Sequence, residues 1–422
     1  YGLNPIAIHQ LHGEGVKLII TVDCGITAVE EARLCKELGI DLVITDHHEC
    51  KEVLPEAVAV VDPHRIDGCY PHKTLSGVGV AFKLAAALCG SQEEVLEQYA
   101  DMVCLGTVAD VMPLQGENRV FVTQGLSSLR RTKRPGIAAL MAECGCDAKN
   151  ITASSIGFML APRINAAGRM GKIELAVELF LTNDPEQGKM LAQALCELNR
   201  QRQAVESEIY EQAVAMLPDT TPEAIVLADD RWHQGVVGIV ASRLTEKYGL
   251  PSILISFEGA VTGEPTPEDV GKGSGRSVKG LNLVDALADS RELLVRFGGH
   301  ELAAGLTVRR ADIPAFREML NRYAAERLTE DMTAVRYEAD CEVDVQQLTM
   351  PLAAELTMLE PFGVANPTPE LICRNLTVYK IIPLGAGKHC KIILAKDGLQ
   401  MQAVWFGTPA STCPFSVSDC VD

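Results

Sequence analysis

The sequence predicts an α/β protein with a parallel-sheet domain, a long connecting helix, a second α/β domain and a C-terminal β-barrel. Short β-branched runs alternate with helical patterns early in the chain, and the same alternation restarts after residue 217. Between the two parts lies a Gln-, Glu- and Ala-rich stretch with almost no helix breakers. We therefore expect domains over residues 1–184, 218–332 and 333–422, with a helix over residues 185–217 between the first two.

Length and composition limit the class of protein. A chain of 422 residues exceeds one ordinary domain, and 47% hydrophobic residues suffice for proper cores. No apolar run reaches the about 18 residues of a membrane-spanning helix, and the start lacks a signal pattern, so we expect a soluble cytoplasmic protein without a membrane partner. The 14 cysteines form no CxxC pair, which argues against a zinc ribbon or a disulfide framework. A net charge of -18 argues against indiscriminate nucleic-acid binding but allows a local basic groove.

Three expected strands of the first domain each lead into an acidic residue. The strands are Val16–Val22, Ile40–Ile44 and Ala57–Val61, and the acids are Asp23, Asp46 and Asp62. Two of these acids precede histidines, namely His47 and His48 after the second strand and His64 after the third. The carboxyl ends of parallel strands meet at one edge of a sheet, where ligands bind.

This arrangement predicts a metal centre. Carboxylates gathered at neighbouring strand ends would repel one another, and a divalent cation would relieve the repulsion. Imidazole and carboxylate groups are both common ligands of such ions. The alternative is that Asp46 caps the next turn and that His47 and His48 are ordinary surface residues.

A helical segment after the third strand supplies a further acid. We expect helices over residues 75–88 and 95–108, and Asp110 follows the second of them between apolar neighbours. Burying an unpaired carboxylate costs several kcal/mol of folding free energy, so a buried Asp110 predicts a cation nearby. The small residues that open the first helix, 75–81, allow close approach to a phosphate or tight helix packing.

Two arginines and an amide lie in a segment of small and apolar residues. Arg163, Asn165 and Arg169 belong to the stretch 161–170, which we expect to be a loop. A guanidinium group binds phosphate through two parallel hydrogen bonds, and an Asn amide can bind a base or a sugar. The segment therefore predicts phosphate binding. The alternative is that both arginines pair with nearby acids.

The second domain carries further candidates for phosphate binding. We expect it to open with a strand, a helix, a strand and a loop, over residues 224–228, 235–248, 252–256 and 259–269. The glycine-rich run 271–277 lacks the spacing of a nucleotide-hydrolysing P-loop, but with Arg276 and Ser277 it is a candidate phosphate cradle. His300 follows paired glycines, where a substrate could approach, and its alternative is a packing role.

The tail predicts a small barrel of the OB type. Strand-like runs occupy residues 376–382, 390–395 and 401–406, at a spacing that suits such a barrel. OB barrels often bind single-stranded nucleic acid.

Several motifs together carry a resemblance to a known family. They are Val22–Gly25, Asp46–His48, Asp62–His64, Val108–Asp110 and Gly298–His300, in order and with similar spacing. With them the chain resembles the DHH phosphoesterase superfamily. The segments Pro162–Arg169 and Pro361–Pro367 are similar to those of the RecJ family of single-strand-specific exonucleases within it.

The resemblance implies a DHH domain, the connecting helix, a DHH-associated domain and an OB-fold, with two Mn²⁺ or Mg²⁺ ions. By matching position, Asp23 would bridge the ions, and His47 and Asp110 would complete one of them. His48 would face the scissile phosphate, with Asp46 orienting an imidazole. From the second domain Arg276, Ser277 and His300 would hold the phosphate or the 5′ end.

The resemblance also implies 5′ to 3′ hydrolysis of single-stranded DNA by a two-metal mechanism, in repair and recombination, with a single-strand-binding protein and a helicase as partners. The family's first motif, Asp-x-Asp-Gly, is not present, so we expect a chain that begins after it and lacks part of the ligand set. This leaves open whether the chain by itself is active, and the roles of Asp62 and His64 are also open. The alternatives are a hydrolase of short oligoribonucleotides or cyclic dinucleotides, and a non-catalytic single-strand-binding scaffold.

Overall fold

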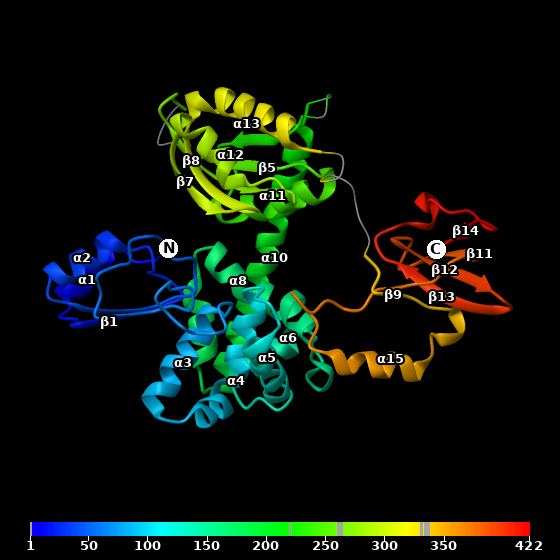
Figure 1. Cartoon of the computed structure of the whole chain (residues 1–422), viewed down its shortest axis with the longest axis horizontal. Coiled ribbons are helices and arrows are strands. Elements are labelled where there is room, and N and C mark those ends of the chain that lie inside the picture. The colour runs from blue at the N-terminus through cyan, green and yellow to red at the C-terminus, as the bar shows by residue number, and fades with distance from the viewer. Residues whose placement is uncertain (1, 219, 221, 260–264, 330–331, 333–337) are drawn as a thin grey trace. The chain divides into compact units, whose positions relative to one another are not determined.

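The computed structural model describes residues 2–218, 220, 222–259, 265–329, 332 and 338–422 (Figure 1). The chain forms two compact units, one over residues 1–131, 150–157 and 337–422 and the other over residues 132–149 and 158–336. The boundary expected between residues 332 and 333, and most of the loop expected over residues 259–269, lie outside the described residues. In the part of the chain that the structure describes, no helix is both long and apolar enough to span a membrane.

The first unit begins with a parallel sheet, as the strand-helix alternation predicts. Strands β1 (Leu18–Val22), β2 (Asp41–Thr45) and β3 (Ala59–Val61) lie in that order, and both pairs are parallel. Helices α1 (Pro5–Gly13) and α2 (Val29–Glu37) cover one face, where Ile8, Ala32 and Ile44 form a core. On the other face the side chains of Leu18, Ile20 and Val22 in β1 remain about half exposed, so β1 is less covered on this face.

Three helices follow the sheet in the first unit. They are α3 (Gly77–Cys89), α4 (Gln92–Ala109) and α5 (Gly116–Leu129). Ser76 and Ser91 cap the first two, because each side-chain oxygen accepts a hydrogen bond from a backbone N–H in the first turn. The rings of Phe82 and Phe121 meet edge to face between α3 and α5. These caps explain why α4 begins three residues before the expected start.

The C-terminal part of the first unit contains strands close to those expected over residues 376–382, 390–395 and 401–406. A four-stranded antiparallel sheet has the order β13-β12-β11-β14. Its strands are β11 (Leu376–Leu384), β12 (His389–Lys396), β13 (Leu399–Trp405) and β14 (Cys420–Val421). Before it come the parallel pair β9 (Cys341–Glu342) and β10 (Leu371–Ile372) and helix α15 (Met350–Leu356). The side chain of Arg119 on α5 donates hydrogen bonds to the carbonyl oxygens of Leu359 and Glu360, which ties this segment to the helices.

The second unit contains the expected long helix, α10 (Pro185–Ala215). Asp184 caps it and Pro185 occupies its first turn, where proline is tolerated. Helices α6 (Pro135–Glu143), α8 (Ala161–Arg169) and α9 (Ile173–Leu181) contact α10. A Cβ on Gly188 would lie 3.1 Å from the backbone nitrogen of Gly136, so small residues let α6 and α10 approach closely.

The expectation of a loop over residues 161–170 was wrong, since most of this segment is helix α8. Pro162 lies in the first turn, where its missing N–H removes no helical hydrogen bond. A short π-helical turn, residues 156–160, leads into α8.

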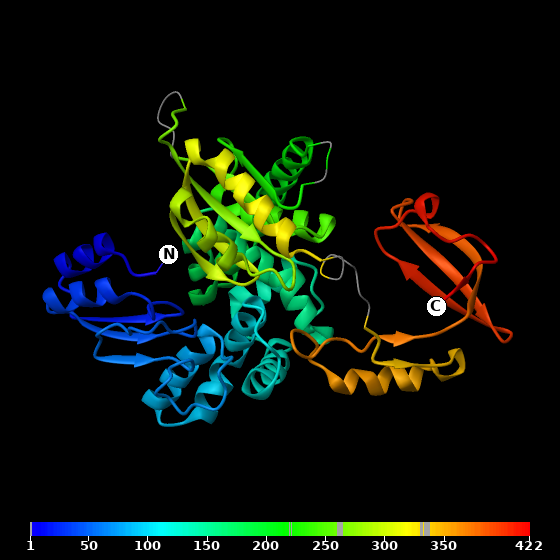
Figure 2. The same cartoon turned by 45° about the horizontal axis from the view of Figure 1, so that its top comes forward.

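A mixed five-stranded sheet forms the rest of the second unit (Figure 2). Its order is β4-β5-β6-β8-β7, in which the first pair is parallel and the others are antiparallel. The strands are β4 (Ile225–Asp229), β5 (Ser252–Ser256), β6 (Val270–Arg276), β7 (Leu294–His300) and β8 (Ala303–Arg309). Helix α11 (Gln234–Tyr248) packs on one face, and α12 (Leu283–Asp289) and α13 (Ile313–Arg327) pack on the other.

Most of the glycine-rich run 271–277, which the sequence makes a candidate phosphate cradle, is strand β6, and this strand is paired on both sides. A Cβ on Gly271 would lie 2.9 Å from the ring of Phe257, and one on Gly273 would lie 2.9 Å from Leu306. The glycines therefore make room for core side chains.

Candidate metal centre

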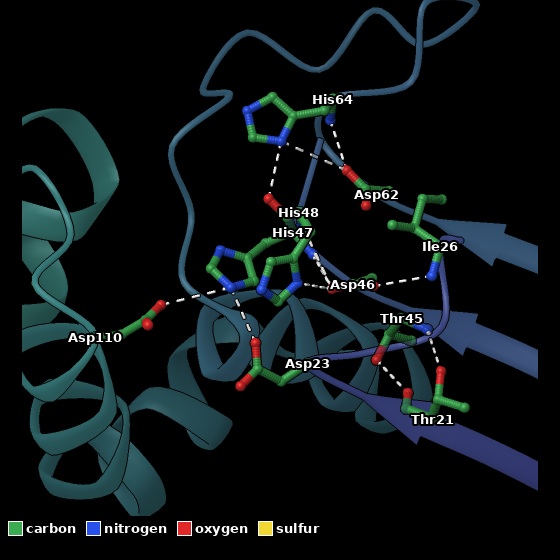
Figure 3. A network of polar contacts seen from close by, with 10 residues as sticks. All are labelled: Thr21, Asp23, Ile26, Thr45, Asp46, His47, His48, Asp62, His64 and Asp110. Carbon is green, nitrogen blue, oxygen red and sulfur yellow. Dashed lines mark hydrogen bonds and ion pairs between the residues drawn. The ribbon is translucent and has the colours of Figure 1, made fainter. Parts of the chain in front are cut away.

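The loops after β1, β2 and β3 bring acidic and imidazole groups together (Figure 3). Asp23 directly follows β1 with a φ of 64°, a left-handed conformation that is uncommon for a residue with a side chain. Its N–H donates to the carbonyl oxygen of Thr45 at 3.0 Å, and the Thr45 hydroxyl donates to the carbonyl oxygen of Thr21 at 2.6 Å. These bonds hold the ends of β1 and β2 side by side.

Both carboxylate oxygens of Asp46 accept hydrogen bonds from other groups of the protein. It is 1% exposed, its Oδ2 accepts from the N–H of Ile26 at 2.9 Å, and its Oδ1 accepts from the N–H of His47 at 2.8 Å. Oδ1 also lies 2.7 Å from Nδ1 of His48. Burial alone would raise the pKa of Asp46, but these bonds outweigh it and lower the pKa below its ordinary value. An ionised Asp46 therefore orients His48 and links the loops after β1 and β2.

His47 lies between two carboxylates. Its Nε2 is 2.9 Å from Oδ1 of Asp23 and 3.5 Å from Oδ2 of Asp110. Its ring is 8% exposed, and Nδ1 has no hydrogen-bonding partner among the described residues. Burial lowers the pKa of His47, but the bond to Asp23 and the charges of Asp110, Asp23 and Asp46 outweigh it and raise the pKa. Negative charge is thus in excess around this imidazole.

Asp110 reaches the cluster from the end of α4. The N–H of Met112 donates to the carbonyl oxygen of Thr107 and that of Val111 to Val108, which is the pattern of a Schellman cap. Val111 takes the left-handed position with a φ of 57°. Burial raises the pKa of Asp110, the charge of His47 lowers it, and the charge of Asp23 raises it again, with a net increase. The Asp110 side chain is 43% exposed, so the cluster remains accessible to solvent.

The cluster fits a hard divalent cation. Asp23, His47 and His48 each offer a ligand atom, and these atoms lie within 4.8 Å of one another. Asp110 adds a second carboxylate beside the same His47 nitrogen. Carboxylate oxygen and neutral imidazole nitrogen are donors that suit Mn²⁺, and oxygen donors suit Mg²⁺. A cation held by these groups would neutralise their excess negative charge.

The third acid at a strand end, Asp62, does not join this cluster. Its Oδ1 accepts from the N–H of His64 at 2.7 Å, and burial, followed by the charge of Asp46, raises its pKa to about 6 despite that bond.

Sequence reasoning missed Gly77, because only the structure shows that this position faces Asp23.

In the second unit two predicted arginines lie near each other. The side chain of Arg276 donates to the hydroxyl of Ser274 and to the carbonyl oxygen of Gly275, and Arg169 donates to the carbonyl oxygen of Gly235. Partial burial and then the positive charge of Arg169 lower the pKa of Arg276. Within the described residues, neither guanidinium lies within ion-pair distance of a carboxylate.

The other predicted phosphate-binding residues differ in their surroundings. Arg163 donates to the carbonyl oxygen of Phe158, and the Ser277 hydroxyl donates to the carbonyl oxygen of Leu281 at 2.7 Å, so both have local partners. Asn165 is exposed on α8, and His300 is exposed at the end of β7. Of this predicted set, Arg169 and Arg276 come from different elements and lie close enough for their charges to interact.

Models of known protein families match three parts of the chain. Residues 4–107 match the model of the DHH family, N-terminal domain, residues 221–326 match the DHHA1 domain, and residues 339–422 match the RecJ OB domain. The single-stranded-DNA-specific exonuclease RecJ of Haemophilus influenzae is 33% identical over 433 residues, which cover 96% of this chain and 73% of the relative. The chain belongs to the RecJ family. The expected family and fold class are thereby confirmed.

Other RecJ proteins differ more in length from this chain. The RecJ of Bacillus subtilis is 40% identical over 409 residues, which cover 96% of this chain and 51% of the relative. The chain thus spans about half of that relative's length. A crystal structure of RecJ from Thermus thermophilus in complex with Mn²⁺ matches with a TM-score of 0.83 and 33% identity, and the match covers 96% of this chain and 58% of the other.

Proposed function

We propose that this protein is a single-stranded-DNA-specific exonuclease that hydrolyses phosphodiester bonds with Mn²⁺ or Mg²⁺. The observation that carries the proposal is the convergence of Asp23, His47, His48 and Asp110 from three elements of one unit. Two solved RecJ structures hold Mn²⁺ and one holds Mg²⁺, which supports the choice of ion. The 5′ to 3′ polarity rests on the family resemblance.

In this proposal Asp23, His47 and Asp110 hold metal, and bound divalent ions supply Lewis acidity to the phosphodiester. His48 has a different task. Its Nδ1 lies 2.7 Å from ionised Asp46, which fixes that nitrogen as the proton carrier and leaves Nε2 as the free end of the ring. The side chain of His48 is 41% exposed, so Nε2 can contact a phosphate oxygen or a leaving group.

Arg169 and Arg276 form the proposed phosphate contact of the second unit. Burial lowers the pKa of Arg276, and the positive charge of the neighbouring Arg169 lowers it further. Neither guanidinium group has a carboxylate partner among the described residues that would offset this repulsion. A phosphate group would relieve this repulsion and accept hydrogen bonds from both. We also propose cytoplasmic location, supported by 14 free cysteines, and a single-strand-binding protein and a helicase as partners, supported by the family resemblance.

Substitution of Asp110 tests the function. In the full-length protein we expect Asp110→Ala to abolish Mn²⁺-dependent nucleotide release from 5′-phosphorylated single-stranded DNA, with little loss of DNA binding by fluorescence anisotropy. Arg322→Ala, on the exposed side of α13, is a matched control that should keep full turnover. Retained turnover in Asp110→Ala would show that Asp110 is not a metal ligand. Two results with the unchanged protein would contradict the proposed exonuclease activity. One is faster cleavage of dinucleotides than of long DNA, and the other is DNA binding without any release of nucleotides.

A further inference from the structure

The loop after β3 reaches the main chain of the metal-site histidine. Nδ1 of His64 lies 2.9 Å from the carbonyl oxygen of His47 (Figure 3). A carbonyl oxygen can only accept, so the proton of this bond belongs to His64 Nδ1. The contact joins residues 17 positions apart in the sequence, and it is separate from the bonds of Asp46.

Asp62 fixes the position of His64. The Asp62 side chain is fully buried, and its Oδ1 accepts the N–H of His64 at 2.7 Å. Its other oxygen, Oδ2, has no hydrogen-bonding partner among the described residues. Burial of a carboxyl group with an unsatisfied oxygen lowers the stability of the fold, so stability alone does not explain an acid at position 62. The structural effect of Asp62 is to orient His64 toward His47.

Two longer contacts of the His64 ring leave this bond as the shortest one. Nδ1 is 3.8 Å from Oδ1 of Asp62 and Nε2 is 3.9 Å from Oε1 of Glu49, and both distances are beyond hydrogen-bonding range. Only 21% of the His64 side chain is exposed, so the ring has little freedom to turn. Meanwhile the N–H of Asp46 donates to the carbonyl oxygen of Val61 at 3.0 Å, so the loops after β2 and β3 are tied together on both sides of His47.

We infer that His64 is a positioning residue for the proposed metal centre, and that Asp62 holds it in place. His64 anchors the peptide of His47 and so directs Nε2 of His47 toward Asp23 and Asp110. Partners that orient a ligand set its affinity for metal. This inference rests on the proposed function, because it assumes that His47 binds metal.

The first test needs no metal. Long-range ¹H–¹⁵N NMR of the metal-free protein, with His64 assigned by comparison with His64→Gln, should show the proton of neutral His64 on Nδ1. A proton on Nε2 would overturn the inference, because the bond to the His47 carbonyl could then not form.

The second test compares three substitutions by the affinity for Mn²⁺, measured from the electron paramagnetic resonance signal of free Mn²⁺. His64→Leu should weaken binding by about tenfold, whereas His64→Asn, whose amide nitrogen occupies the place of Nδ1, should stay within about threefold of the unchanged protein. His64→Gln places its amide near Nε2 instead and should behave like His64→Leu. Circular dichroism melting identifies variants that are merely unfolded.

The outcomes separate the inference from the proposed function. Unchanged affinity in a folded His64→Leu, or equal weakening in His64→Asn and His64→Leu, would overturn the positioning role while the metal centre stands. Absence of Mn²⁺ binding by the unchanged protein would overturn both.

Discussion

Replacing Gly77 by alanine tests whether the position of Asp23 controls metal binding at the candidate metal centre. Gly77 is the first residue of α3 and is buried. A Cβ placed on it would lie 2.5 Å from Cβ and Cγ of Asp23, and closer still to Oδ1. Carbon atoms in contact are ordinarily about 3.5–4.0 Å apart, so the Asp23 side chain must move by about 1 Å.

The size of that shift sets the expected effect. Oδ1 of Asp23 is 2.9 Å from Nε2 of His47, and functional groups need to be held within about 0.5 Å of their working geometry. We therefore expect the affinity for Mn²⁺ to fall by about 10- to 100-fold in Gly77→Ala. Overpacking costs about 1–3 kcal/mol. The better helix propensity of alanine offsets up to about 1 kcal/mol of this, so the protein should remain folded.

Gly79→Ala is the matched control on the same helix. A Cβ there would lie 3.3 Å from the Ser76 hydroxyl and 3.4 Å from Leu75, which small adjustments can accommodate. Titration with Mn²⁺, followed by the resonance signal of the free ion, should show normal affinity for Gly79→Ala. Wild-type affinity in a folded Gly77→Ala would refute the reasoning, since Asp23 would then move without effect.

Three further outcomes follow from single contacts. Val111→Gly should raise the free energy of unfolding in urea by about 1 kcal/mol, because Val111 is 66% exposed and glycine adopts its left-handed conformation without strain; a loss of stability would contradict this. Burial raises the pKa of Glu117, but the hydrogen bonds from Lys83 and Tyr70 outweigh burial and lower the pKa. Ionised Glu117 therefore stabilises the fold above its unfolded pKa of about 4.3. At pH 7 the unchanged protein should have a larger free energy of unfolding than Glu117→Gln. This difference should shrink as the pH falls below the unfolded pKa of Glu117, and a constant difference across an acid titration would contradict the prediction. Cys144 and Cys196 lie 52 positions apart with their sulfur atoms 3.9 Å apart, so diamide should oxidise both thiols to one disulfide worth about 4 kcal/mol, detected by mass spectrometry and absent in Cys144→Ser.

The part of the candidate metal centre that follows strands could be predicted from the sequence. Asp23 and Asp46 come directly after β-branched runs, and the position of a residue after a parallel strand fixes the edge of the sheet on which it lies. Asp110 could be found because it is an acid among apolar neighbours at the end of a helix. Each of these predictions depends only on local pattern.

What could not be predicted depends on packing between distant segments. Gly271 and Gly273 read as a phosphate cradle because glycine permits close approach of any kind, and only the tertiary fold shows that Phe257 and Leu306 occupy the space. Gly77 has the same ambiguity, and there the neighbour is the side chain of Asp23. A glycine in the sequence thus indicates close approach without identifying the approaching group.

Backbone strain connects the two carboxylates of the site. Asp23 has a φ of 64°, and Val111, which directly follows Asp110, has a φ of 57°. A β-branched residue in this conformation is a genuine outlier, and such strain costs about 1–3 kcal/mol at each position. The surroundings enforce it, through the bond from the Asp23 N–H to Thr45 and through the Schellman cap at the end of α4. Because both strained turns carry or adjoin an acid that points at His47, the fold gives up stability to hold two carboxylates beside one imidazole. A cation bound there would attract both carboxylates and so offset this cost.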